Sequence, residues 1–155
     1  MILVDAGPLV ALVDASDEHH ARCVEVLKDL EEPMGTVWPA VTEALYLLLD
    51  VPAGQDAVLE LLRRGTVRLV ALDRDDVSRM KDLMAKYRDQ PMDLADAALV
   101  RVAERDGLDR VFTVDRTDFE VYRIGKRNRF RIVPEGPAGR RRRQRRVARG
   151  RKRRT

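Results

Sequence analysis

The sequence is poor in several residue types, and each shortage excludes a class of protein. Its one cysteine, Cys23, rules out a disulfide framework or a cysteine-based metal cluster and suits a reducing cytoplasm. Aromatic residues make up only 5% of the chain, which argues against nucleic-acid recognition mainly by base stacking. Residues 1–5 leave no room for the apolar region of a signal peptide, and the longest apolar run, residues 44–49, is far too short to cross a bilayer. We therefore expect a cytoplasmic protein with no membrane partner.

Positive charge is concentrated at the end of the chain. The formal net charge is +4, but 11 of the 30 Lys and Arg residues follow residue 139, where there is no acid, so the preceding residues hold 19 basic against 26 acidic groups. A block of like charge with few apolar residues cannot compensate for the entropy lost on ordering. Pro and Gly residues between 134 and 139 mark a boundary. The sequence thus predicts a folded domain over residues 1–133 and a basic, flexible tail over residues 134–155.

Short apolar runs typical of strands alternate with helical patterns along the first 133 residues. This alternation predicts the α/β class, and we expect a three-layer α/β/α sandwich around a mostly parallel sheet of roughly five strands. Strands are predicted over residues 2–4, 34–38, 67–72, 111–114 and 130–133. Helices are predicted over residues 9–13, 16–32, 39–49, 54–64 and 73–88, with a further helix that begins at residue 93.

Two aspartates stand at the ends of predicted strands. Asp5 follows the run Ile2-Leu3-Val4, and Asp115 follows an apolar run that ends at Val114. The continuous apolar character of both runs is typical of strands buried in a parallel sheet. If these strands are neighbours, their two carboxylates are neighbours as well, at the edge of the sheet where α/β proteins bind ligands.

Glu43 interrupts a predicted helix that is otherwise apolar on nearly all sides. No Lys or Arg lies between Pro33 and Gly54 to neutralise it. Because burial of an unpaired charge is costly, a carboxylate in such a position usually has a cation, a proton or several hydrogen-bond donors. A metal ion is the economical explanation, and a partly exposed helical face accounts for Glu43 equally well.

Three more aspartates belong to the same part of the sequence, and each also has a purely structural interpretation. Asp93 is a good helix N-cap, and Asp96 three residues later completes a capping-box pattern. Asp118 is suited to capping a short turn over residues 117–121. The co-occurrence of all these acids at places that one topology brings together favours a shared pocket.

Crowded carboxylates repel one another, so a stable ionised arrangement needs a hard divalent cation. Oxygen ligands without His or Cys favour Mg²⁺ or Mn²⁺ over zinc. Such a site keeps water on the metal and leaves room for phosphate oxygens, which is the layout for metal-assisted phosphodiester hydrolysis.

Four blocks of the sequence resemble those of a known family. They read ILVDAGPLVALVD, VTEALYLL, PMDLADAALVRVAE and FTVDRTDFEVYR. In this order and spacing they are similar to PIN-domain ribonucleases, and specifically to the VapC-type toxins of bacterial toxin–antitoxin pairs. The resemblance extends over essentially all of residues 1–133.

The resemblance implies an activity, partners and a set of site residues. It implies a Mg²⁺- or Mn²⁺-dependent endoribonuclease that forms a homodimer and is neutralised by a small antitoxin encoded beside it. The family's functional positions fall on the catalytic metal ligands Asp5, Glu43, Asp96 and Asp115, the accessory acids Asp93 and Asp118, and the supporting hydroxyl of Thr113.

The tail is where the sequence departs from the family, whose members usually end near residue 133. The run Arg140, Arg141, Arg142 and Arg143 would gain salt-dependent affinity for RNA phosphates. A solvated extension without a role is an equally good interpretation.

Other functions stay open from the residues alone. A non-catalytic RNA-binding module would depend on the tail and not on Asp96, and a solitary RNA-processing nuclease would have no antitoxin. A receiver-type phosphoacceptor domain also groups acids at strand ends, but it needs a Lys at a later strand end, and none follows Val114 before Lys126.

Overall fold

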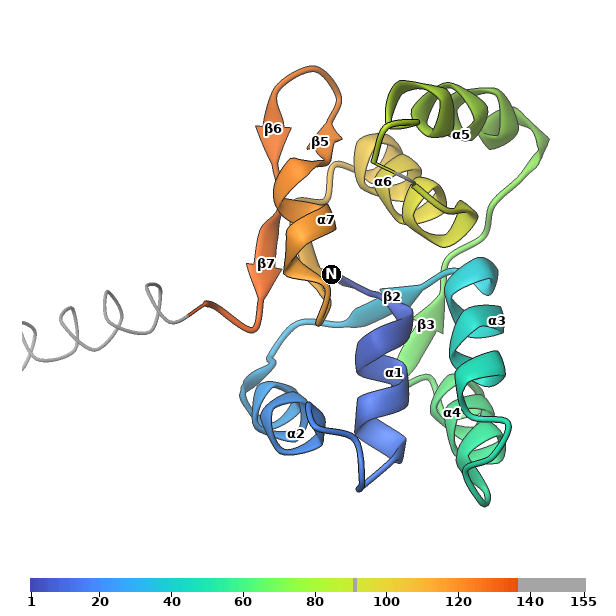
Figure 1. Cartoon of the computed structure of the whole chain (residues 1–155), viewed down its shortest axis with the longest axis vertical. Helices are drawn as coiled ribbons and strands as arrows, with labels where there is room; N and C mark the ends of the chain where they lie inside the picture. The colour runs from blue at the N-terminus through green and yellow to red at the C-terminus, as the bar shows by residue number, and fades with distance from the viewer. Residues whose placement is uncertain (91, 137–155) are drawn as a thin grey trace, which may run out of the picture.

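Five short strands form one parallel sheet in the computed structural model, which describes residues 1–90 and 92–136 (Figure 1). The strands follow the order β3-β2-β1-β4-β7, and each neighbouring pair is parallel. Their bounds are β1 (Ile2–Val4), β2 (Met34–Thr36), β3 (Val67–Leu69), β4 (Arg110–Phe112) and β7 (Arg131–Val133). The predicted α/β class and five-stranded parallel sheet are confirmed, and all five carboxyl ends meet at one edge.

The central strand is β1, and it is apolar on both faces. Ile2, Leu3 and Val4 are completely buried. Leu3 is in register with Gly35 of β2 on one side and with Val111 of β4 on the other. The strand order also reverses at β1, since β2 and β3 extend to one side and β4 and β7 to the other. In α/β sheets this reversal point opens the crevice in which ligands bind.

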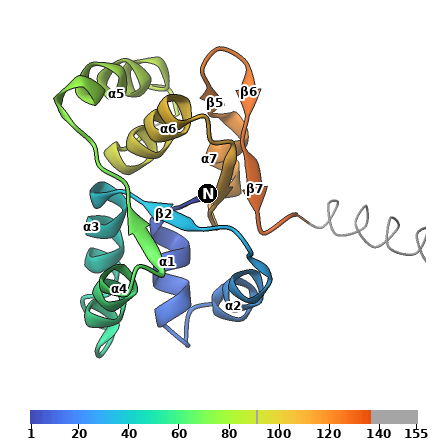
Figure 2. The same ribbon diagram turned by 180° about the vertical axis from the view of Figure 1, so that it is seen from behind.

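Helices cover both faces of the sheet (Figures 1 and 2). One apolar core contains Ile2, Val4 and Phe112, with side chains from α1 to α4, and the other contains Leu3 and Val111, with side chains mostly from α5 to α7. The helices are α1 (Ala6–Val13), α2 (His20–Asp29), α3 (Trp38–Leu47), α4 (Gly54–Arg63), α5 (Arg74–Lys86), α6 (Leu94–Asp106) and α7 (Arg116–Val121). The predicted three-layer sandwich is therefore confirmed.

Some boundaries differ from the sequence-based expectation. Helix α1 begins three residues early, because Asp5 caps it by accepting the backbone N–H of Ala6. Helix α2 begins late, because Asp14 and Asp17 hold the preceding residues in turns by accepting the N–H groups of Ser16 and His19. A small antiparallel hairpin, β5 (Arg123–Ile124) and β6 (Asn128–Arg129), was not predicted.

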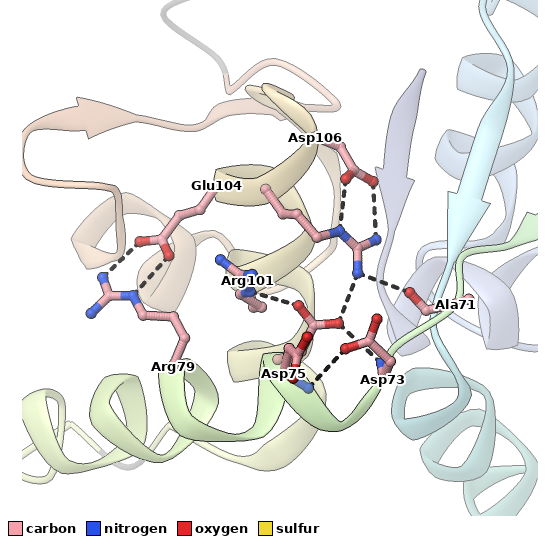
Figure 3. A network of polar contacts seen from close by, with 9 residues as sticks. Ala71, Asp73, Asp75, Arg79, Arg101, Glu104 and Asp106 are labelled. Carbon is pink, nitrogen blue, oxygen red and sulfur yellow. Dashed lines mark hydrogen bonds and ion pairs between the residues drawn. The ribbon is translucent and has the colours of Figure 1, made fainter.

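A polar network ties α5 to α6 and to the hairpin (Figure 3). The Asp76 side chain is 1% exposed, and its two oxygens accept from Arg101 Nε at 2.7 Å and Arg105 Nη1 at 2.8 Å. Arg79 makes two hydrogen bonds of 2.8 Å to Glu104, whose carboxylate also accepts the N–H of Gly125 in the hairpin turn. These contacts fix the direction of α6, whose N-terminus carries Asp93 and Asp96.

None of the helices within the described residues combines the length and the apolar character that crossing a bilayer requires.

Candidate active site

Asp5 lies at the centre of the carboxyl edge, directly after β1. Its Oδ1 accepts the N–H of Ala6 at 2.8 Å, and its Oδ2 accepts the hydroxyl of Thr113 at 2.8 Å. The side chain is buried, and burial raises its pKa to about 6 even though both hydrogen bonds act in the opposite direction. Negative charge on Asp93 and Asp115 raises this pKa further. The carboxylate is thus held in one orientation in a place that disfavours its charge.

Thr113 links two of the acidic positions. Its hydroxyl donates to Asp5 and accepts the backbone N–H of Asp115 at 3.0 Å, and its side chain is completely buried. Strands β1 and β4 are neighbours, as the sequence argument required, with Val4 in register with Phe112. One hydroxyl group therefore sets the position of Asp115 relative to Asp5.

Glu43 projects from α3 towards the same edge. Burial raises its pKa to about 7, and the charges of Asp93 and Asp5 raise it further. No side chain of residues 1–90 and 92–136 makes an ion pair or hydrogen bond with Glu43. The carboxylate is half-buried and has nothing to neutralise it among those residues.

Asp93 and Asp96 form the capping box that their spacing predicts. Asp93 Oδ1 accepts the N–H of Asp96 at 2.9 Å, and Asp96 Oδ2 accepts the N–H of Asp93 at 3.4 Å. The same Oδ2 accepts the hydroxyl of Tyr122 at 2.9 Å. Burial, followed by the charges of Asp93 and Asp5, raises the pKa of Asp96 to about 7. Asp96 is therefore the N3 residue of a structural capping box, and its surroundings also disfavour its ionised form.

Asp115 and Asp118 stand at the start of α7. Asp115 is the N-cap and accepts the N–H of Asp118 at 3.3 Å, so the cap is Asp115 and not Asp118. Burial raises the pKa of Asp118, as does the charge of Asp115, while a hydrogen bond from Gln90 lowers it. Asp115 itself is exposed and open to solvent.

The six acids lie within electrostatic range of one another at this edge. Asp93 contributes repulsion to the pKa of Asp5, Glu43, Asp96 and Asp118. No Lys or Arg is among the causes of these four shifts. In residues 1–90 and 92–136, this edge therefore concentrates negative charge, and no basic side chain there offsets it in the four shifts.

The donor chemistry of this crevice fits a hard divalent cation. All six side chains offer only carboxylate oxygens, which Mg²⁺ and Mn²⁺ prefer. As they lie, no three or more His, Cys, Asp or Glu side chains in the described ranges are arranged as a finished metal site.

Tyr122 is a residue of this site that sequence reasoning missed. Its ring is completely buried and packs edge-on against Tyr87 and Phe119, with ring centroids 5.1 and 5.4 Å apart. Burial, together with the charge of Asp96, raises the pKa of the Tyr122 hydroxyl, so it remains a donor to Asp96. The only sequence signal is that Tyr122 lies seven residues after Asp115 in the last family block. The predicted RNA contacts Arg140 to Arg143 lie outside the described residues.

Comparison with known proteins shows which family the chain matches. The family model described as PIN domain matches residues 2–126. The chain is 29% identical over 136 residues to Ribonuclease VapC26 of Mycobacterium tuberculosis, covering 86% of this chain and 100% of that protein.

Two solved structures share the fold. The VapC20 toxin of Mycobacterium tuberculosis, described as cleaving the sarcin–ricin loop, superposes with a TM-score of 0.63 at 18% identity, covering 72% of this chain and 87% of that one. A toxin–antitoxin complex from Klebsiella pneumoniae gives a TM-score of 0.59 at 18% identity, covering 77% and 90%. Together with the match over residues 2–126, these likenesses confirm the resemblance seen in the four sequence blocks: the chain belongs to the PIN domain family.

Proposed function

We propose that the protein is a Mg²⁺- or Mn²⁺-dependent endoribonuclease that acts on cytoplasmic RNA as the toxin of a toxin–antitoxin pair. The observation that carries the proposal is the cluster of acids at the carboxyl edge of the sheet. Asp5, Glu43 and Asp96 converge there with raised pKa values and no basic partner among the residues that shift them. The similarity to a ribonuclease of the VapC type supports RNA as the substrate.

Asp5, Glu43, Asp96 and Asp115 would hold the cation, with Asp93 and Asp118 as accessory acids. When bound, the cation supplies positive charge that lowers the pKa of an attacking water and offsets charge on the leaving oxygen. Hydrogen bonds from the chain's own residues hold these carboxylates in position before a cation binds.

Thr113 and the Ala6 N–H fix both oxygens of Asp5, and Tyr122 fixes one oxygen of Asp96. Each oxygen of Asp5 keeps a lone pair that can face the cation, and Asp96 can offer its other oxygen, Oδ1, because its Oδ2 accepts two hydrogen bonds. The carboxylates also orient any water between them, because water donates hydrogen bonds to them. The exposed side of the crevice, at Asp115, leaves room for the RNA phosphate.

The direct test is RNA cleavage by the purified protein in chelator, in Mg²⁺ and in Mn²⁺. Cleavage should require the divalent cation, and Asp5→Asn should lower the rate by at least about a hundredfold, because loss of a mere outer-shell partner already costs about 10- to 100-fold. Asp50 is an exposed acid beyond α3, so Asp50→Asn is the matched control and should cleave like the parent.

Cleavage in chelator, or an Asp5→Asn variant as fast as Asp50→Asn, would show that the acids are not a catalytic centre. Absence of cleavage by the parent protein in either cation, with RNA still bound, would instead favour the alternative class, a non-catalytic RNA-binding module. In that case RNA binding should be indifferent to Asp96→Asn.

A protein partner is supported by exposed apolar side chains on α3 and directly after it. Trp38, Tyr46 and Leu47 of α3 and Leu49 beyond its end are 55 to 71% exposed. Exposed aromatic and aliphatic groups are typical of protein interfaces. We assign these side chains to the contact with an antitoxin or with a second protomer of a homodimer.

Size-exclusion chromatography with light scattering, with and without the neighbouring gene product, separates these cases. A monomer that stays monomeric and unbound would favour a solitary RNA-processing nuclease.

A further inference from the structure

The hairpin of strands β5 and β6 concentrates positive charge. Four of the seven residues from 123 to 129 are basic and none is acidic, although acids outnumber bases before residue 140. We call Arg123, Lys126, Arg127 and Arg129 the basic hairpin. The side chains of Lys126, Arg127 and Arg129 are exposed, and that of Arg123 is partly buried.

No acid neutralises the basic hairpin within the part of the chain that the structure describes, because none of the ion pairs there includes its four side chains. Arginines on either side of it do have acidic partners. Arg116 Nη2 lies 3.2 Å from Glu120 Oε1, and Arg131 Nη2 lies 2.7 Å from Asp109 Oδ1. The hairpin therefore presents charge that the described fold leaves unpaired.

Two of these cations stand opposite each other across the hairpin. Arg123 is in register with Arg129, and like charges directly opposite one another destabilise a pair of strands. Basic side chains on edge strands often prevent pairing with another chain, but strands of two residues are already too short to need that protection. An anionic ligand would remove the repulsion, so the charge is suited to binding one.

The hairpin stands on a fixed support. Ile124 and Phe130 are buried in the core, where the ring centroid of Phe130 is 5.4 Å from that of Phe119. Arg123 Nη1 donates to the carbonyl oxygens of three residues at the end of α7, and its backbone N–H donates to the Tyr87 hydroxyl at 3.0 Å. Because the support is already ordered, less entropy is lost when a ligand binds to the exposed cations.

The basic hairpin lies beside α6, the helix whose first turn carries Asp96 (Figures 1 and 2). Tyr122 directly precedes β5 and donates its hydroxyl to Asp96 at 2.9 Å. Gly125 in the hairpin turn donates its N–H at 2.9 Å to Glu104, eight residues beyond Asp96 in α6. At 1.5 Å per residue, these two contacts are about 12 Å apart along the helix axis. The turn is therefore separate from the acids but near enough to contact the same RNA strand.

We propose that the basic hairpin is an RNA-binding arm, in which Lys126, Arg127 and Arg129 bind backbone phosphates of a single-stranded RNA that extends from the acidic site along α6. The acids at the carboxyl edge repel RNA, and cations set apart from them provide affinity by releasing counterions from phosphates. Phosphate contacts carry no base information, so the arm orients the strand and does not select its sequence. The inference rests on the proposed function for its ligand, RNA.

Binding of a fluorescent single-stranded RNA to the full chain, measured by anisotropy in chelator, tests the arm without cleavage. The triple variant Lys126→Gln, Arg127→Gln and Arg129→Gln should bind at least about tenfold more weakly at low salt. Loss of three phosphate contacts should also reduce the slope of log affinity against log salt by about 2. Residues 137–155 stay unchanged in every variant, so their contribution cancels in the comparison.

A matched control removes three positive charges on the other side of the sheet. Arg63 and Arg64 on α4 and Arg68 on β3 are exposed, and β3 is the edge strand opposite β7. Arg63→Gln, Arg64→Gln and Arg68→Gln lower the net charge as much as the hairpin variant does. The control should keep the salt slope of the parent and stay within about twofold of its affinity, because exposed charges beyond the screening length contribute little.

A second variant separates loss of charge from distortion of the hairpin. Lys126→Arg, Arg127→Lys and Arg129→Lys change the side-chain shapes and keep all three charges. This variant should bind RNA within about twofold of the parent, because counterion release depends on charge. Binding as weak as that of the glutamine variant would overturn the inference, since the shape of the hairpin and not its charge would then matter.

Two results of the binding experiment with the glutamine variant would also overturn the inference. An affinity and a salt slope equal to those of the control would show that the hairpin does not bind RNA. Unchanged RNA binding with weaker binding of the neighbouring gene product would assign the hairpin to a protein partner.

Single-turnover cleavage in Mn²⁺ adds a readout of where on the RNA the arm acts. The glutamine variant should need more protein for half-maximal rate, while its rate at saturation stays within about twofold of the parent, because the interaction is the same in the ground state and the transition state. A fall in the saturated rate as large as the fall in affinity would place the cations at the reacting phosphate, against a separate arm. Because binding is read without metal, its failure is distinct from failure of cleavage, which tests the proposed function.

Discussion

Asp96 occupies a place that favours its protonated form. Its pKa is raised to about 7, so the folded protein binds this proton more tightly than the unfolded chain does. The associated stability is fully present below the ordinary pKa of 3.8 and is lost as pH rises through about 7. Asparagine resembles the protonated form and can accept from Tyr122 in the same way.

We therefore predict that Asp96→Asn stabilises the metal-free protein while it abolishes cleavage. The free energy of unfolding at about pH 8 should increase by about 1–2 kcal/mol, less than the full shift implies because the side chain is partly exposed. Denaturant unfolding in chelator at about pH 5 and pH 8 measures the difference, which should shrink at the lower pH. A destabilised variant at pH 8 would show that Asp96 is an ordinary cap.

Tyr122 acts on the reaction through Asp96. Its hydroxyl lowers the pKa of Asp96, so Tyr122→Phe should raise that pKa and shift the acid limb of the pH–rate profile to higher pH. Cleavage near pH 7 should fall about three- to tenfold, and raising the pH should restore most of it, because the loss lies in ionisation. The aromatic packing with Tyr87 and Phe119 remains. A uniform loss at all pH values would indicate a packing defect instead.

Residues of the site differ in how far the sequence reveals them. Asp5 and Asp115 each follow an apolar run. The local sequence pattern is enough to locate the end of each strand, and parallel topology then brings the two strand ends to the same edge of the sheet. The role of Asp93 as a cap is local as well, since the two residues of the capping box are three positions apart. The hydrogen bond from Tyr122 to Asp96 joins residues 26 apart and arises from packing that no local pattern encodes.

At the scale of elements, the position of α6 depends on a buried acid far from the crevice. Burial alone would raise the pKa of Asp76, but the Asp73 N–H, Arg101 and Arg105 hold it below its ordinary value. The stability that this provides is present above pH 3.8 and is lost as pH falls through the lowered pKa.

Asp76→Ala should lower the free energy of unfolding by about 2–4 kcal/mol, because it leaves two arginines and the α5 N-terminus without their acceptor. Asp75 is exposed and directly precedes Asp76, so Asp75→Ala is a matched control. It should change the free energy of unfolding by less than about 1 kcal/mol. Urea unfolding at neutral pH checks both. Equal effects of the two substitutions would show that the network does not hold α5 to α6.

Some elements depend on tertiary contacts and not on the local sequence pattern alone. The strands of the parallel sheet were predictable because apolar residues dominate the runs that contain them, even where Arg68 interrupts β3, whereas β5 and β6 have two residues each and β6 is exposed and polar. The hairpin forms because Gly125 adopts a positive φ of 63° and its N–H reaches Glu104 on α6. A partner on another helix cannot be found from the hairpin's own sequence.

At the scale of the molecule, a divalent cation should compensate for the repulsion among the acids. Saturating Mg²⁺ or Mn²⁺ at about 100 times its dissociation constant should stabilise the fold by about 2.7 kcal/mol. The rise in melting temperature should be larger at pH 8 than at pH 5, because protons compete for carboxylates whose pKa values are about 6 to 7. Equal rises at both pH values would place the cation elsewhere.

The central claim is that acids from β1, α3, α6 and the β4–α7 junction form one cation site. Calorimetric titration of Mn²⁺ at about pH 8 tests it most directly. The parent and Asp50→Asn should bind with the same affinity, and Asp5→Asn, Glu43→Gln and Asp96→Asn should each weaken binding at least about tenfold. Parent-like affinity in all three variants would contradict the claim.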